Sequence, residues 1–383
     1  MTEQVKLLPV RFSSEELALR EEVREFLVDE VPNFPSCPGL GMDGAHSPEF
    51  SKKLAERGWV GMAIPLEYGG HGRTPIERFI VVEELLAVGA PVNAHWIADR
   101  QTAPTILRYG SELQRQRFLP AIAAGTCFFS IGMSEPDSGS DLASVRTTAT
   151  AVENGWNISG TKTWTSGAHL NHFFVVLCRT SSSSDDRHLG LSQFIVDLRA
   201  PGVAINPIKP ISDTQHFNEV VMDQVFVPTE MLLGELGQGW AQVTSELSFE
   251  RSGPDRFLST WPLLVAFLSQ HDDLDNRESE HVGRLIARFC AIRQLALSVT
   301  RALQGGHEVE VEAAMLKDLG THFEQELVAT VQYLVDDDPA LSTTSILEKL
   351  LGQAILASPS YTIRGGTTEI LRSIIAQRLR VSG

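Results

Sequence analysis

The chain has 383 residues, more than one hydrophobic core usually supports, so two or three structural units are expected. Its formal net charge of −16 argues against a nucleic-acid partner and a polybasic membrane patch, although a local basic pocket could still hold an anion. The N-terminus has no signal-like apolar run, no stretch approaches the about 18 apolar residues of a membrane span, and the four cysteines form no CxxC pair. A cytoplasmic protein with free thiols and no membrane insertion is therefore expected.

The first third of the chain is expected to be helical. Ser13 and Glu16 have the spacing of a capping box, and the apolar residues that follow them fall on one helical face. Further helices are predicted at residues 47–60, 75–90 and 112–125.

Short runs rich in Val, Ile and Phe, separated by turn residues, begin near Cys127 and predict a β unit of roughly 100 residues. The strands are expected at residues 172–180, 190–198, 202–206 and 219–228. The stretch "GWNISGTKTWTSG" and the strand after it read as a hairpin-like pair, with Trp164 in the first member.

Helical periodicity returns at Gly239, and the stretch from Trp240 to Phe267 reads as helical throughout, although it contains Glu250 and Arg251. The order of helices, strands and helices predicts an α+β protein. The expected domains are an N-terminal helical domain at 1–126, a central β domain at 127–235 and a C-terminal helical domain at 236–383.

Two short motifs carry little weight. "GLGMDG" matches a dinucleotide-binding glycine pattern, but it does not follow a buried strand or open a helix. "HLNH" offers two histidines without a third ligand nearby, so no metal site is expected.

A loop of small and polar residues, "SEPDSGSD", lies between an apolar run and a later strand. Such a loop presents backbone amides and hydroxyls that suit an extended, oxygen-rich ligand. Further along, Trp164 either belongs to a core or forms a flat wall for a planar cofactor, with Ser166 at its polar edge.

With three more stretches, these segments resemble the acyl-CoA dehydrogenase superfamily over nearly the whole chain. The matching stretches, in the family's order, are "PLEYGGHG", "QRQRFLPAIAAGTCFFSIGMSEPDSGSDLASVRT", "GTKTWTSGA", "HFNEVVMDQVFVP" with "GELGQGW", and "GGTTEILRSIIAQRL". The resemblance implies the family's fold, in which the central domain at 127–235 is β-barrel-like and the C-terminal domain at 236–383 is a four-helix bundle. It also implies FAD-dependent oxidation of an acyl-CoA thioester to a trans-2-enoyl-CoA, with the flavin ring between the β domain and the bundle.

The resemblance also implies which residues bind the ligands. Ser140 matches a residue that contacts the pantetheine arm of CoA. The positions matched to FAD contacts are Ile131, Met133, Ser134, Trp164, Ser166, Thr367 and Glu369.

The catalytic base is the first departure from the common family pattern. Many members carry a Glu just before the Gly-Thr of the last motif, where this chain has Gly365. A minority places the Glu in an "L-x-x-E-R" context on a bundle helix, which "LSFERSG" matches with Glu250. The resemblance therefore implies Glu250 as the α-proton base, with Gly365 leaving room for it beside the substrate. Adjacent helical residues diverge by about 100°, so Arg251 would need its own partner and is interpreted as a buried structural cation beside the substrate.

The FAD nucleotide site is the second departure, because the family's "R-x-x-F-G" and "Q-x-x-G-G-x-G" motifs are both missing. The first region is acidic instead and would repel a pyrophosphate. The chain thus resembles the base-bearing subunit of bacterial α2β2 dehydrogenases that shorten steroid side chains. That resemblance implies a homologous partner subunit that supplies the nucleotide half, and an electron-transferring flavoprotein as acceptor.

Two other functions stay open on the sequence. A flavin oxidase or monooxygenase of the same fold would pass electrons to O2, and a non-catalytic partner subunit would fit the missing FAD motifs. The substrate pocket is open too, because its candidate residues could line the acyl tail or lie on a helix surface. These residues are His95, Trp96, Asp99 and Arg100.

Overall fold

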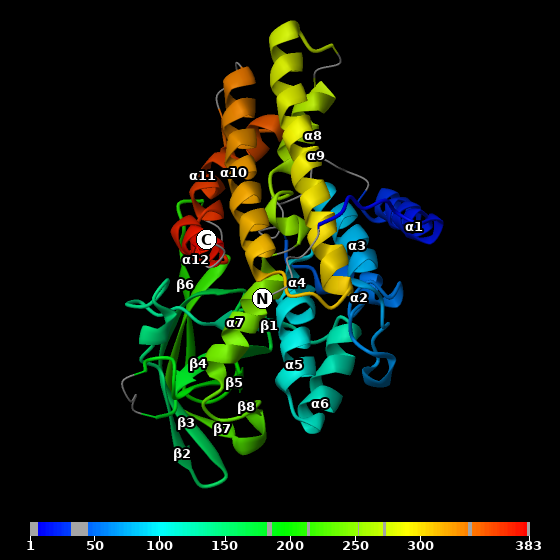
Figure 1. Cartoon of the computed structure of the whole chain (residues 1–383). Coiled ribbons are helices and arrows are strands. Elements are labelled where there is room, and N and C mark those ends of the chain that lie inside the picture. Colours follow the sequence, from blue (N-terminus) through cyan, green and yellow to red (C-terminus); the bar gives the residue numbers. More distant parts are fainter. Residues whose placement is uncertain are drawn as a thin grey trace. The chain divides into compact units, whose positions relative to one another are not determined.

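The computed structural model describes most of the chain. The described residues are 7–31, 45–181, 186–212, 215–251, 253–270, 273–335 and 339–380, without the side chains of 247–250 and 378–380. The chain forms two compact units from interleaved segments (Figure 1). We call Met1–His46, Arg73–Val92 and Ser248–Gly383 the helical unit, and Ser47–Gly72 and Asn93–Leu247 the sheet unit.

The helical unit contains an antiparallel-type bundle in which α10 contacts α8, α9, α11 and α12, and α9 and α10 run side by side (Figure 1). The predicted C-terminal bundle is therefore confirmed. Its helices are α8 (Trp261–Gln270), α9 (Asn276–Gln304), α10 (Glu310–Leu334), α11 (Ile346–Tyr361) and α12 (Thr368–Arg380).

Two helices from the start of the chain complete the helical unit: α1 (Ser14–Glu30) and α3 (Pro75–Ala87). The capping box predicted at Ser13 and Glu16 is confirmed, since each side chain bonds the other's backbone amide. The α3 helix packs on both α1 and α9. Ion pairs from Arg20 to Glu84 and from Arg293 to Glu83 tie the three helices together.

The sheet unit is built on one eight-stranded sheet in the order β6-β7-β3-β2-β4-β5-β8, with β1 added beside β4. The strands are β1 (Phe129–Gly132), β2 (Thr148–Val152), β3 (Gly155–Ser166), β4 (Phe173–Arg179), β5 (Leu191–Asp197), β6 (Val203–Ile208), β7 (Phe217–Pro228) and β8 (Leu232–Leu233). The helices of this unit are α2 (Pro48–Glu56), α4 (Asn93–Ile97), α5 (Ala103–Tyr109), α6 (Glu112–Ala123) and most of α7 (Gly239–Glu250). Helices and an antiparallel-rich sheet in one chain confirm the α+β class.

The hairpin expected between β3 and β4 is wrong. The β3 strand pairs with β2 and β7, whereas β4 pairs with β5 and, in parallel, with β1. The tight hairpin is the one between β2 and β3, which turns at Asn154 with φ +60°. Residues 167–172 instead connect β3 to β4 past β2, which lies between them in the sheet.

The continuous helix expected from Trp240 to Phe267 is also wrong. The α7 helix ends at Glu250, a short 3-10 turn follows at Pro254–Arg256, and α8 begins at Trp261. Gly253 takes an extended conformation, which the following proline favours over the helical one. Glu250 and Arg251 therefore lie at a helix end rather than inside a helix.

Other expectations from the sequence have mixed outcomes. Cys127, Cys178 and Cys290 are free, and Cys37 lies outside the described residues, as does the "GLGMDG" stretch. Within the described ranges, no helix is both long and apolar enough to cross a membrane. The division into three consecutive domains stays a prediction.

Candidate functional site

The polar loop after β1 is organised around the carboxylate of Glu135. Its two oxygens accept hydrogen bonds from the amides of Arg146 and Thr147 at 2.7 and 2.8 Å. Backbone bonds between Glu135 and Ser138 close a tight turn, and the Ser138 hydroxyl donates to the carbonyl of Asp141. A single buried acidic side chain thus fixes both ends of the loop.

Lys162 on β3 supplies the counter-charge for this carboxylate. It has no exposed surface, and its ammonium lies 2.8 Å from Glu135 and 3.1 Å from the carbonyl oxygen of Met133. Burial alone would raise the pKa of the Glu135 carboxyl, but Lys162 and the donors around it outweigh burial and lower that pKa. The predicted cofactor residues Met133 and Ser134 are therefore held by their backbones, since the Ser134 carbonyl also accepts from the Thr163 amide.

Trp164 lies in a β-bulge of β3, where Thr163 and Trp164 interrupt the pairing with β7. Its φ of +57° is unusual for a bulky residue, and 56% of its surface is exposed. One edge contacts Phe217 with ring centres 5.7 Å apart. The core alternative left open by the sequence is therefore wrong, and the aromatic ring is exposed on a strained backbone.

The other flavin candidates of the sheet unit lie on β1, which carries Ile131, and at the end of β3, which carries Ser166. Ser130 on β1 donates to the carbonyl of Ser166 at 2.7 Å, and Asn171 donates to Ser130 and to the Phe129 carbonyl. Ile131 is half-buried on β1, two positions before Met133.

The arrangement fits a flavin. The hydroxyls of Ser134 and Ser166 are half-buried, and neither makes a hydrogen bond to any described part of the chain. Both hydroxyls are thus open to a polar ligand, and Ser166 lies two residues from the exposed ring of Trp164. The structure brings together five of the predicted cofactor residues on β1, β3 and the loop between them.

Ser140, the predicted pantetheine contact, is exposed on the loop beside Asp141. The guanidinium of Arg187 pairs with both oxygens of Asp141, at 2.8 and 3.0 Å. This bidentate pair holds the segment after β4 against the Ser140 loop, although its exposure makes its contribution to stability small.

The predicted substrate residues of the helical unit meet at the turn between α11 and α12. Arg251 is buried, and its Nε donates to the carbonyl of Gly365 at 3.3 Å. Lys317 on α10 donates to the carbonyl of Gly366 at 2.6 Å. Arg251 therefore has a backbone carbonyl as one partner, and the side chain of the adjacent Glu250 lies outside the described residues.

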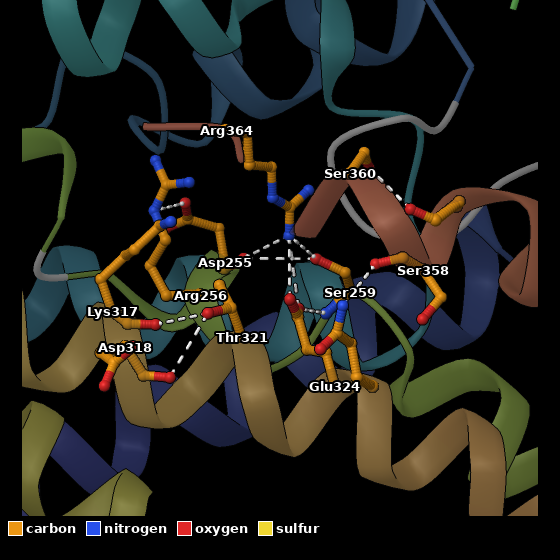
Figure 2. A network of polar contacts seen from close by, with 12 residues as sticks. Asp255, Arg256, Ser259, Lys317, Asp318, Thr321, Glu324, Ser358, Ser360 and Arg364 are labelled. Carbon is orange, nitrogen blue, oxygen red and sulfur yellow. Dashed lines mark hydrogen bonds and ion pairs between the residues drawn. The ribbon is translucent and has the colours of Figure 1, made fainter. Parts of the chain in front are cut away.

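A buried polar network continues from this turn into the bundle. Figure 2 shows the guanidinium of Arg364 reaching Ser259 at 2.6 Å and the Glu324 carboxylate at 3.1 Å. Glu324 has no exposed surface and also accepts from the Ser259 amide. Burial raises the pKa of Glu324, and Arg364 opposes that rise.

Thr367 and Glu369 begin helix α12. The Thr367 hydroxyl accepts weakly from the Ile370 amide at 3.4 Å, as an N-cap does. Glu369 is exposed, and hydrogen bonds from its own amide and from Thr367 lower its pKa.

The segment whose role the sequence leaves open, residues 95–100, is largely buried rather than a helix surface. His95 is hydrogen-bonded to Ser51 at 2.8 Å, and the Arg100 guanidinium lies 5.3 Å from the centre of the Trp96 ring. Asp99 accepts from the Gly61 amide. Residues 98–102 form a π-helical turn, a rare element that is common at functional sites.

Several residues of these clusters were not predicted from the sequence. Lys162, Glu135, Lys317, Glu324 and Arg364 all make buried charge contacts. The available signal was a charged residue inside an apolar run, as in "AAMLKDLG", since a lysine there must find a partner when the helix is buried.

Family models cover most of the chain. The acyl-CoA dehydrogenase N-terminal domain matches residues 13–126, the middle domain residues 130–225 and the C-terminal domain residues 277–380.

Similar curated proteins come from Mycobacterium tuberculosis. Acyl-CoA dehydrogenase FadE29 is 32% identical, over 96% of this chain and 97% of that protein. Acyl-CoA dehydrogenase IpdE1 is 32% identical, over 94% of this chain and 96% of that protein. Acyl-CoA dehydrogenase FadE34 is 32% identical over 85% of this chain, which spans only 45% of FadE34.

Two similar solved structures carry two-component names. The Tcur3481-Tcur3483 steroid ACAD superposes with a TM-score of 0.85 at 26% identity, over 98% of this chain and 99% of that one. The ChsE4-ChsE5 complex from Mycobacterium tuberculosis gives 0.80 at 25% identity, over 97% of this chain and 98% of that one.

Proposed function

Since this chain belongs to the acyl-CoA dehydrogenase family of FAD-binding oxidoreductases, we propose that it catalyses α,β-dehydrogenation of a bulky acyl-CoA thioester to the trans-2-enoyl-CoA. FAD, when bound, accepts the hydride that leaves the β-carbon. The chain's own residues bind and orient the thioester, remove the α-proton and exclude water.

Glu250 is the proposed base. One observation carries this assignment: Arg251, the next residue, is hydrogen-bonded to Gly365, which occupies the family's usual base position. The end of α7 is thus linked directly to the turn from which the usual glutamate is missing. A carboxylate placed there takes the α-proton while negative charge develops on the thioester oxygen, and nearby donors stabilise that charge.

The flavin contacts are proposed on the residues that the sequence predicts. Trp164 offers its exposed face to the ring, Ser134 and Ser166 offer hydroxyls, and Ile131 on β1 and Met133 just after it lie nearby in the chain. Thr367 and Glu369 at the start of α12 are proposed near the ribityl and pyrophosphate, and Ser140 is proposed on the pantetheine arm.

A steroid side chain is the proposed acyl group. Support comes from the similar structure named a steroid ACAD, at 26% identity over 98% of this chain. The polar set of buried His95 and Arg100 with half-buried Asp99 is compatible with a substrate that carries ring oxygens.

A homologous second subunit is proposed to supply the nucleotide half of the FAD site, in an α2β2 assembly. Where the family's pyrophosphate-binding arginine is missing, Asp275 and Glu278 instead form the capping box of α9. Both carboxylates lie at the positive end of that helix, which leaves little attraction for another anion. The two-component names of the similar structures support this reading. An electron-transferring flavoprotein is the proposed acceptor.

The test compares the chain purified alone with the chain co-expressed with a homologous dehydrogenase that carries the "R-x-x-F-G" motif. We expect little FAD on the chain alone and a stoichiometric amount on the complex, read from flavin absorbance after desalting. One FAD per chain in the lone protein would refute the shared site.

Reduction of that flavin by cholyl-CoA under anaerobic conditions tests the activity. The missing nucleotide motifs also fit a non-catalytic subunit, in which case Glu250→Gln would leave the reduction rate unchanged. Fast reoxidation of the reduced flavin by O2 would favour an oxidase.

A further inference from the structure

Two buried cationic side chains donate hydrogen bonds to consecutive carbonyls of the Gly365–Gly366 turn. Arg251, just after α7, donates to Gly365, and Lys317, in the middle of α10, donates to Gly366. Lys317 has no exposed surface and Arg251 is 4% exposed. We call these two contacts the carbonyl clamp.

The backbone of the turn explains why a clamp is useful. Gly365 and Gly366 have φ of +67° and +98°, a region that L side chains rarely adopt. A Cβ on Gly366 would lie 3.2 Å from an Arg251 guanidinium nitrogen, so the glycine also makes room for the cation. Two glycines in sequence are intrinsically mobile, and the clamp fixes the peptide planes that they leave free.

The clamp also acts on the amides of the same peptide groups. A carbonyl that accepts from a cation polarises its peptide and strengthens the N–H on the other side. Those N–H groups belong to Gly366 and Thr367, and neither donates a hydrogen bond within the described parts of the chain. Next to them, the hydroxyl of Thr368 is buried and has no hydrogen-bond partner among the described residues.

We propose that Lys317 is a positioning residue for α-proton abstraction, acting through the carbonyl clamp; this inference rests on the proposed function. Lys317 fixes and polarises the turn that replaces the family's usual base, and Arg251 ties that turn to the end of the helix that carries Glu250. The carbonyl clamp thereby fixes the position of the base relative to the amide donors of the turn. Lys317 itself does not touch the reacting atoms.

A purely structural lysine would stabilise the bundle without affecting chemistry, and the two roles predict different kinetics. Loss of a positioning contact lowers the rate of proton abstraction while ground-state binding is kept, since the donors matter most when charge develops on the thioester oxygen. Loss of a structural contact lowers thermal stability and flavin content but leaves the rate per bound flavin unchanged.

The test uses the full chain with its partner subunit in four forms: wild type, Lys317→Met, Lys317→Gln and the control Lys349→Met, which removes an exposed lysine of α11. Anaerobic stopped-flow with cholyl-CoA gives the limiting rate of flavin reduction per bound flavin and the dissociation constant. Hydrogen exchange over residues 362–370 follows the turn itself.

For Lys317→Met we expect a limiting rate about 10- to 100-fold below wild type with a nearly unchanged dissociation constant, and faster exchange at Gly366 and Thr367. Lys317→Gln keeps a neutral donor, so we expect an intermediate rate, and this variant serves if the methionine protein does not fold. The Lys349→Met control should match wild type.

An unchanged rate per flavin in both Lys317 variants would overturn the inference while the proposed function stands. If wild-type protein reduces no flavin with cholyl-CoA or octanoyl-CoA, the proposed function fails and the inference falls with it.

Discussion

Replacing Lys162 by methionine tests whether the loop after β1 depends on one buried ion pair. Methionine keeps a similar volume but leaves the Glu135 carboxylate without its counter-charge, 2.8 Å from where the ammonium was. Removing one partner of a buried pair costs about 3–5 kcal/mol. Glu135 would keep two backbone donors, at 2.7 and 2.8 Å, so we expect the lower end, about 3 kcal/mol less free energy of unfolding.

The same substitution should shift the acid sensitivity of the protein. A lowered carboxyl pKa contributes stability that is present above the unfolded-state pKa, about 4.3, and is lost as the pH falls through the folded-state value. Without Lys162 the pKa of Glu135 rises, so we expect Lys162→Met to lose stability at a higher pH than wild type does.

Urea unfolding followed by circular dichroism, repeated across the acid range, measures both effects. Lys52→Met, which removes an exposed lysine of α2, is the matched control and should change the free energy by less than about 0.5 kcal/mol. The double variant with Glu135→Gln should recover about 1–2 kcal/mol, since no charge is then buried alone. A loss below about 1 kcal/mol in Lys162→Met, or no recovery in the double variant, would refute the reasoning.

Three further predictions concern the proposed reaction and the bundle. Glu250→Gln should slow flavin reduction by acyl-CoA about 100- to 10,000-fold with flavin content unchanged, and near-normal reduction would exclude Glu250 as the base. Trp164→Gly should relieve the strain of the left-handed backbone at this position and raise the free energy of unfolding by up to about 1 kcal/mol. The complex that contains this variant should lose FAD more readily on desalting than the wild-type complex does. Equal FAD retention by the two complexes would argue against a flavin contact. Because burial raises the pKa of Glu324, the stability of the folded protein should decline as the pH rises above about 4.3, the pKa of the unfolded-state carboxyl. Glu324→Gln should flatten that decline when it is compared with wild type by urea unfolding at about pH 5 and about pH 8. Parallel pH profiles of the two proteins would show that Glu324 does not titrate in the folded protein.

Local features of this fold were readable from the sequence. The capping box at Ser13 and Glu16 forms as predicted because its partners are three residues apart, and backbone geometry alone brings them together. The Gly253–Pro254 pair is also a local signal, because a residue before proline disfavours the helical conformation and so favours a helix end near Glu250. The apolar residues on both sides of the pair made the stretch read as one continuous helix. The absence of a glutamate at Gly365 was equally visible, and it led to Glu250, whose role stays a prediction.

Tertiary structure alone decided which charges are paired and which aromatic residue is exposed. Lys162 pairs with Glu135, 27 residues away in the sequence, and Lys317 bonds the carbonyl of Gly366, 49 residues away. A buried charge needs a hydrogen-bonding partner, and the fold determines which distant residue supplies it. No local pattern indicates such a partner. Trp164 is exposed because a bulge in its pairing with β7 turns it out of the sheet, and that irregularity depends on the register of a strand some 50 residues away. The sequence by itself determined the types of residue available for chemistry, and long-range packing determined which of them meet.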